Sequence, residues 1–192
     1  HGIFLNDHPW VHWPNANDFE RLVASGTAVA HCPNVFWRRG IALNHVGRYM
    51  SAGIPLGVGT DTFPHNFLHE LEIAMVAGRL MAGTFDQATT EQLFWAGTVG
   101  GARAIGRDDI GKLEVGCKAD LVLVDLEHPY MQPMRDPIRS LLYSAGDRAI
   151  TDVFVDGTRV VDGGEVRTID IETTAAKLNE FQKVTISGVR QR

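Results

Sequence analysis

The chain has 192 residues, 44% of them hydrophobic, and a formal net charge of −5, which allows one or two domains with their own cores. The mild acidity and the lack of a Lys/Arg cluster argue against a nucleic-acid surface, and no apolar run approaches the roughly 20 residues of a membrane span. Two cysteines without motif spacing, Cys32 and Cys117, favour reduced thiols in a cytoplasmic protein over a disulfide.

The N-terminal part of the chain alternates between short apolar strands and amphipathic helices. The predicted strands cover residues 1–5, 27–31 and 54–61. The predicted helices cover residues 18–24, 43–50, 65–81 and 89–105, the last of them opened by a capping-box pattern at Thr89 and Gln92. A turn at residues 32–34 and a basic loop at residues 35–40 complete this part. The alternation is typical of an α/β fold with parallel strands.

The pattern changes after residue 108, where we place a domain boundary. Residues 119–125 are predicted as a strand, and two further strands at residues 151–155 and 158–161 flank Asp156-Gly157, a strong hairpin signal. A last helix is predicted over residues 171–184. The sequence therefore predicts one domain over residues 1–108 and a small β module with a terminal helix over residues 109–192.

Asp61 ends the apolar run Ile54-Pro55-Leu56-Gly57-Val58-Gly59-Thr60-Asp61. The run suits a strand buried on both faces, and catalytic groups collect at the C-terminal ends of such strands in barrel enzymes. A carboxylate there is costly to bury unless it is paired or binds a metal. Asp61 is therefore a candidate metal ligand or catalytic base, and the alternative is a turn or helix-cap aspartate.

Several histidines also lie at informative positions. His1 and His31 each end a predicted strand, and for His31 a structural role is favoured. His65 and His69 stand four residues apart on a predicted helix and could share a metal. We prefer the alternative in which His65 borders the site and His69 is solvated.

Charged and aromatic residues offer weaker signals. Trp37, Arg38 and Arg39 either line a pocket for a planar or anionic ligand or form a basic loop. Glu70 and Glu72 are predicted as surface or first-turn charges of the helix that follows Asp61, favoured there by the helix dipole.

Motifs along the chain carry a family resemblance. They are His1-Gly2-Ile3-Phe4-Leu5, Ala30-His31-Cys32-Pro33-Asn34, Gly57-Val58-Gly59-Thr60-Asp61 and residues 110–121, which match the pattern IGxLxxGxxADL. In this order they resemble the amidohydrolase superfamily, closest to the cytosine deaminase and triazine chlorohydrolase/aminohydrolase branch. The resemblance places them after barrel strands six, seven and eight and at the start of a returning β-sandwich.

The resemblance implies the C-terminal part of a (β/α)8 barrel, followed by a small β-sandwich module and a C-terminal helix. It also implies hydrolysis of a non-peptide carbon–nitrogen bond, in which a metal-activated hydroxide deaminates or dechlorinates a nitrogen heterocycle. One divalent metal ion, zinc or iron, is expected, with Asp61 as its ligand and as proton acceptor. His1 is expected to act beside Asp61 in catalysis, and His65 and Trp37 are expected to bind substrate.

The chain departs from the family pattern because it has no His-x-His pair, no strand-five metal histidine and no nearby acidic proton shuttle. A catalytic zinc takes about three protein ligands, and a whole barrel takes about 250 residues. We therefore expect the C-terminal portion of a longer cytoplasmic enzyme, inactive without its missing N-terminal segment; the alternative is a non-catalytic fragment or scaffold. The expected partners are a small heterocyclic substrate and further copies of the chain, with no nucleic acid and no membrane.

Overall fold

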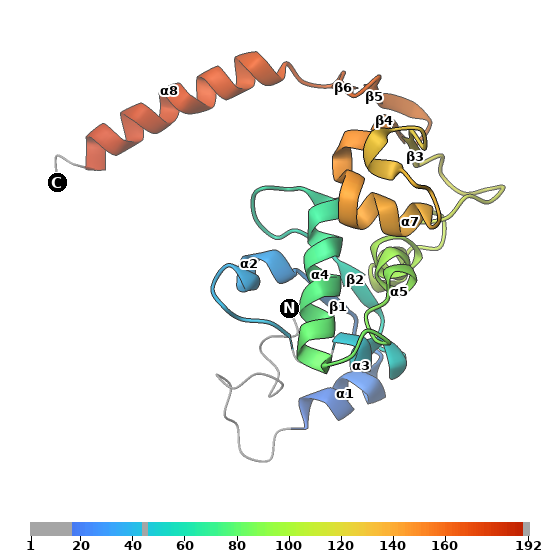
Figure 1. The fold of residues 1–192 in the computed structure, drawn as a ribbon. Helices are drawn as coiled ribbons and strands as arrows, with labels where there is room; N and C mark the ends of the chain where they lie inside the picture. Colours follow the sequence, from blue (N-terminus) through green and yellow to red (C-terminus); the bar gives the residue numbers. More distant parts are fainter. Residues whose placement is uncertain (1–16, 44–45, 190–192) are drawn as a thin grey trace. The chain divides into compact units, whose positions relative to one another are not determined.

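The computed structural model describes residues 17–43 and 46–189, whose course is drawn in Figure 1. Contacts within the chain define two compact units, one of residues 1–118 with 125–149 and one of residues 119–124 with 150–192. The predicted strand at residues 1–5 lies outside the described residues. The two units interleave along the chain. The predicted domain boundary near residue 108 stays a prediction.

Two parallel strands form the centre of the first unit. Strand β1 (Val29–His31) pairs with β2 (Leu56–Val58), so that Ala30 lies opposite Gly57. The N–H of Gly59 donates to the carbonyl of His31 over 3.0 Å and extends the pairing past β2. Parallel neighbours need a crossover connection of a dozen or more residues, and helices lie between these strands in the chain. The mixed α/β organisation predicted for this part is confirmed.

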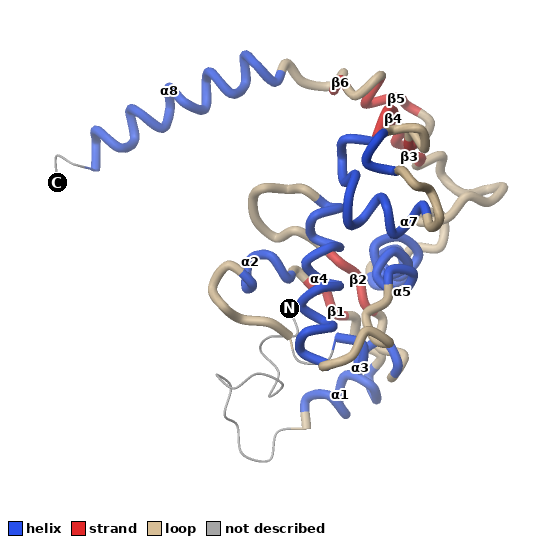
Figure 2. Tube along the Cα trace, in the orientation of Figure 1, coloured by secondary structure: helices blue, strands red, loops and turns tan. Residues whose placement is uncertain are grey.

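Helices pack on both faces of the strand pair, as the blue segments of Figure 2 show. On one face Val29 and Leu56 join a core with Tyr49 and Met75. On the other face a Cβ added to Gly57 would lie 3.1 Å from a backbone carbon of a helix. The helices of this part are α1 (Asp18–Ser25), α2 (Pro33–Trp37), α3 (Val46–Ser51), α4 (Phe67–Ala82), α5 (Thr90–Trp95), the π-helical η2 (Ala96–Gly100) and α6 (Gly101–Ala104).

The ends of α4 and α5 follow from their sequences. Asn66 caps α4 by accepting a hydrogen bond from the N–H of His69, and Gly83 closes the helix in the left-handed conformation, with φ 65°. The predicted capping box of α5 is confirmed, because the Thr89 side chain accepts from the N–H of Gln92 and the Gln92 side chain accepts from the N–H of Thr89. These caps satisfy backbone donors that a helix start leaves unpaired.

The basic loop predicted at residues 35–40 is wrong over its first part, because α2 continues to Trp37. Pro33 occupies its first turn, where a missing N–H costs nothing. The N–H of Asn34 donates to a side chain of α4, 36 positions further along the chain. Because the partner of the Asn34 N–H lies 36 positions away, no capping signal appears in the local sequence of α2.

Residues 126–149 form short helical segments that the sequence analysis did not predict. Met131, Leu142 and Ala145 are buried there, and Arg79 of α4 donates to the hydroxyl of Tyr143 over 2.5 Å. Short segments lack the sustained periodicity that identifies a helix from sequence. They are η3 (Pro129–Met131), α7 (Pro137–Ser140), η4 (Leu141–Ala145) and η5 (Gly146–Ala149).

The second unit contains an antiparallel sheet with strand order β3-β4-β5-β6. The predicted hairpin is confirmed, since Asp156 and Gly157 connect β4 to β5 with φ values of 50° and 78°, as a two-residue turn of this type needs. The strands are β3 (Leu121–Val124), β4 (Ile150–Val155), β5 (Thr158–Asp162) and β6 (Glu165–Val166). Helix α8 (Ile171–Val189) follows; within the described residues no helix combines the length and the apolar character needed to cross a bilayer.

Candidate functional site

The loops that follow β1 and β2 leave the strand pair at the same end because the strands are parallel. Cys32 comes directly after β1, and Gly59 comes directly after β2. A Cβ added to Gly59 would lie 3.6 Å from the sulfur of Cys32, so the two loop starts are in contact. Burial, followed by the charge of Asp61, raises the pKa of the Cys32 thiol. Asp61 therefore lies close enough to the β1 loop to act on it electrostatically.

Asp61 occupies an unusual backbone conformation at the centre of a tight turn. Its φ is 56°, and the N–H of Thr62 donates to the carbonyl of Thr60 over 2.5 Å. Left-handed backbone costs a non-glycine residue about 1–2 kcal/mol, although aspartate tolerates it better than most. The side chain is exposed. Backbone strain of this kind is concentrated at functional sites, and it favours a role for Asp61 beyond an ordinary turn.

His65 is brought to the Asp61 turn by a side-chain contact. The Nδ1 atom of His65 and the hydroxyl oxygen of Thr60 lie 3.0 Å apart in a hydrogen bond, and the His65 side chain is exposed. The structure therefore groups two of the predicted site residues, Asp61 and His65, in one loop. His1 lies outside the described residues, so its predicted role stays a prediction.

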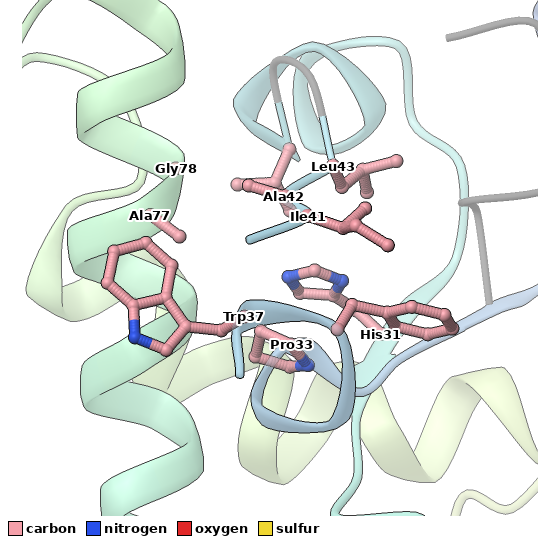
Figure 3. Close-up of a pocket in the computed structure, with 10 residues that line it drawn as sticks. His31, Pro33, Trp37, Ile41, Ala42, Leu43, Ala77 and Gly78 are labelled. Atoms are coloured by element: carbon pink, nitrogen blue, oxygen red, sulfur yellow. The ribbon is translucent and has the colours of Figure 1, made fainter. Parts of the chain in front are cut away.

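Trp37 lies at the end of α2 and is 41% exposed. Figure 3 shows its indole beside Ala77 of α4, while the imidazole of His31 lies near Ile41 in the same small pocket. The space for water there is about 10 Å³, which is close to the need of one water molecule. The predicted contact of Trp37 with substrate stays a prediction.

His31 is buried at the end of β1, with 6% of its surface exposed. Burial lowers its pKa to about 4, so the imidazole is neutral near pH 7. A neutral, buried imidazole agrees with the structural role that the sequence analysis favoured.

Glu70 lies in the first turn of α4, one of its two predicted positions, but the prediction of a surface charge is wrong. Its side chain is completely buried, and its Oε1 atom accepts the N–H of Asn34 over 2.7 Å. The signal that identifies it is helical spacing, since Glu70 stands four and seven residues before the buried Ala74 and Ala77 and so shares their face. Glu72, by contrast, is partly exposed beside His69.

The described residues offer one candidate metal ligand. Asp61 offers a carboxylate at the end of β2, but residues 17–43 and 46–189 contain no group of three or more His, Cys, Asp or Glu side chains that could hold a metal ion. Catalytic zinc takes about three protein ligands. A zinc ion bound at Asp61 would therefore need further ligands from outside the described residues.

Comparison with known proteins gives a consistent result. Residues 1–160 match the Amidohydrolase family. A 5-methylthioadenosine/S-adenosylhomocysteine deaminase of Bacillus thuringiensis (strain Al Hakam) is 32% identical over 188 residues, which cover 95% of this chain and 41% of that protein. The chain thus spans about two fifths of the length of the relatives that it matches.

Solved structures agree with these sequence matches. A zinc-bound adenosine deaminase from Xanthomonas campestris superposes with a TM-score of 0.82 and 27% identity, over 88% of this chain and 40% of that one. An atrazine chlorohydrolase from Arthrobacter aurescens TC1, complexed with zinc, gives a TM-score of 0.75 and 26% identity, over 84% of this chain and 38% of that one. The resemblance described from the sequence motifs is confirmed.

Proposed function

The chain belongs to the amidohydrolase family, and on this premise we propose that the full-length protein is a metal-dependent hydrolase that removes an amino group from a nitrogen heterocycle. The similarity to a nucleoside deaminase over 95% of the chain supports deamination. The likeness to an atrazine chlorohydrolase supports the related replacement of chloride as a second candidate, because both reactions begin with attack of water on a ring carbon.

The observation that carries the proposal is the strained Asp61 turn at the end of β2. It places an exposed carboxylate and His65 in one loop, beside the loop that follows β1. Carboxylates and imidazoles are the usual oxygen and nitrogen ligands or proton carriers of metal hydrolases. Aspartate tolerates this backbone conformation better than most residues, so the turn can present a carboxylate at the end of β2.

We assign β1 and β2 to the seventh and eighth strands of a (β/α)8 barrel, with the predicted strand at residues 1–5 as the sixth. Their parallel pairing and the helices on both faces support this assignment. The antiparallel sheet β3–β6 would belong to a β-sandwich completed by another part of the full-length protein. In this arrangement Asp61 lies at the C-terminal face of the barrel, where such enzymes carry out their chemistry.

Asp61 would hold one zinc ion together with ligands outside the described residues. A bound zinc lowers the pKa of an attacking water towards neutrality. Asp61 would accept a proton from this water as the water oxygen bonds to the ring carbon. The proton would then pass to the amino nitrogen, which leaves as ammonia when the carbon–nitrogen bond breaks. His1 would donate a hydrogen bond to the developing tetrahedral centre, while His65 and Trp37 would contact the ring.

The proposal is tested by measuring ammonia release from 5-methylthioadenosine, S-adenosylhomocysteine and adenosine, and chloride release from atrazine, with the full-length protein that the gene encodes. We expect ammonia release from at least one nucleoside, its loss after chelation of the metal, and its recovery with added zinc. Chloride release alone would move the assignment to the second candidate. Full activity of the metal-free protein, or no release from any of the compounds, would contradict the proposal.

A further inference from the structure

Glu70 is a buried carboxyl group that the proposed reaction does not use. It lies in the first turn of α4 and is completely buried. Its Oε1 atom accepts the N–H of Asn34, while its Oε2 atom is buried without a hydrogen-bond partner among the described residues. Burying a carboxyl group with one unsatisfied oxygen costs free energy. An apolar side chain would pack this position without that cost, so packing alone does not explain a glutamate here.

The Glu70–Asn34 bond joins α2 to α4, the helices that follow the two loops of the candidate site. Asn34 is the second residue of α2, three positions after the end of β1. Glu70 lies nine residues after Asp61, in the helix that follows the Asp61 turn. No side chain of Cys32 caps α2, so the Asn34 N–H would lack a partner without Glu70.

A second contact, near the surface, joins the end of α2 to the Asp61 loop. The Nη2 atom of Arg38, directly after α2, donates to the carbonyl of Phe63 over 2.9 Å. The guanidinium carbon of Arg38 also lies 5.3 Å from the centre of the Phe63 ring, within the range of a cation–π contact. Phe63 is two residues after Asp61. The segment after β1 is thus bonded to the segment after β2 twice, in the interior through α4 and at the surface through the Asp61 loop.

We propose that Glu70 is a positioning residue that holds the turn after β1 against the Asp61 turn in the reactive arrangement. This inference rests on the proposed function, since it assigns Glu70 to the same site. Glu70 acts through the backbone of Asn34 and does not itself touch substrate. The pKa of the Cys32 thiol agrees with this arrangement. Burial raises it most, and the charges of Asp61 and Glu70 also raise it.

Two substitutions of Glu70 separate positioning from mere packing. In Glu70→Gln the amide oxygen can still accept the Asn34 N–H, whereas Glu70→Ala leaves that donor unpaired. Residues that orient the groups of a metal site typically contribute about tenfold to a hundredfold to activity. We expect Glu70→Ala to lower kcat by about this factor with KM changed little, and Glu70→Gln to retain kcat within about threefold.

The experiment uses the full-length protein with Glu70→Ala, Glu70→Gln and the control Glu72→Ala. Glu72 lies on the same helix and carries the same charge, but its side chain is 36% exposed and pairs with His69 at the surface of α4. Turnover is normalised to folded, zinc-loaded protein. Hydrogen exchange is measured in peptides that cover residues 32–38 and 60–66.

The proposal predicts a lower normalised kcat and faster exchange in both peptides for Glu70→Ala, and neither change for Glu70→Gln or Glu72→Ala. A normal kcat in Glu70→Ala would overturn it, and so would a loss in Glu70→Gln as large as that in Glu70→Ala. If the wild-type protein releases product from none of the compounds, the proposed function fails. The positioning role of Glu70 is then tested by hydrogen exchange alone. Unchanged exchange in Glu70→Ala would then overturn the positioning role, and faster exchange in both peptides would support it.

Discussion

The two units differ in the partners of their buried carboxyl groups. In the second unit, Asp152 of β4 is 8% exposed and accepts a hydrogen bond from Nε of Arg159 over 2.6 Å, and Arg159 also pairs with Asp162. In the first unit, Glu70 is fully buried and accepts only a backbone N–H among the described residues.

The pKa directions follow from these surroundings. Hydrogen bonds from Thr151 and Arg159 hold the pKa of Asp152 below its usual range, while burial raises the pKa of Glu70. His31, also in the first unit, is held neutral by burial. The second unit therefore stabilises charged side chains with partners of opposite sign, as a structural sheet does. Titratable groups pushed towards their neutral forms gather at functional sites, and here they flank the loops after β1 and β2.

The largest stability effect that follows from this contrast belongs to His31. Its pKa is about 4 in the folded chain and about 6.5 when unfolded, so the unfolded state takes up a proton first as the pH falls. The His31 contribution to stability is complete above pH 6.5 and is lost between pH 6.5 and pH 4, by about 3 kcal/mol. Denaturant unfolding of the full-length protein at pH 7, 6, 5 and 4 measures this loss.

The matched variant for this measurement is His31→Gln, which cannot titrate in this range. We expect its free energy of unfolding to fall less steeply over the same pH values, and the difference between the two curves isolates His31. If the free energy of unfolding falls equally steeply with pH in the wild type and His31→Gln, His31 is not held neutral by burial. The first unit would then no longer differ from the second at this residue.

A smaller effect is expected from the ion pairs of the second unit. Arg159→Ala removes the partner of the buried Asp152, and we expect the melting temperature to fall by about 2–4 °C without a change in turnover. Arg167→Ala is the control, because Arg167 contacts Asp162 and Glu165, whose side chains are 38% and 74% exposed, and exposed pairs stabilise little. Thermal scans and turnover of both variants provide the test. A loss of turnover in Arg159→Ala at normal stability would remove the distinction between a structural and a functional unit.

Local sequence signals predicted much of the fold. Asp156 and Gly157 predicted the hairpin because few residues accept positive φ at both central positions, and Thr89 with Gln92 predicted the start of α5. The apolar run that ends in Asp61 predicted β2 and drew attention to its carboxylate. Each of these signals depends on residues at most a few positions apart.

The features that were not predicted depend on distant residues. The start of α2 depends on Glu70, which lies 36 positions from Asn34, and the burial of Glu70 depends on the packing of α4. The spacing of Glu70 from Ala74 and Ala77 indicates a shared face, but a glutamate on an apolar face becomes interpretable only when its partner is known. For the same reason, the sequence could single out Asp61 but not the contact that holds its neighbouring loop.

The central claim is that Asp61 is a ligand and proton acceptor of a metal-dependent site, and the most direct measurement is turnover and zinc content of full-length Asp61→Asn, Asp61→Ala and Asp86→Ala. Asparagine tolerates positive φ, so Asp61→Asn keeps the turn and removes only the charge, while Asp86 is an exposed aspartate in the loop after α4. The account predicts that both Asp61 variants lose at least about a hundredfold in kcat and contain less zinc, while Asp86→Ala behaves as the wild type. Undiminished turnover in Asp61→Asn and Asp61→Ala would contradict it.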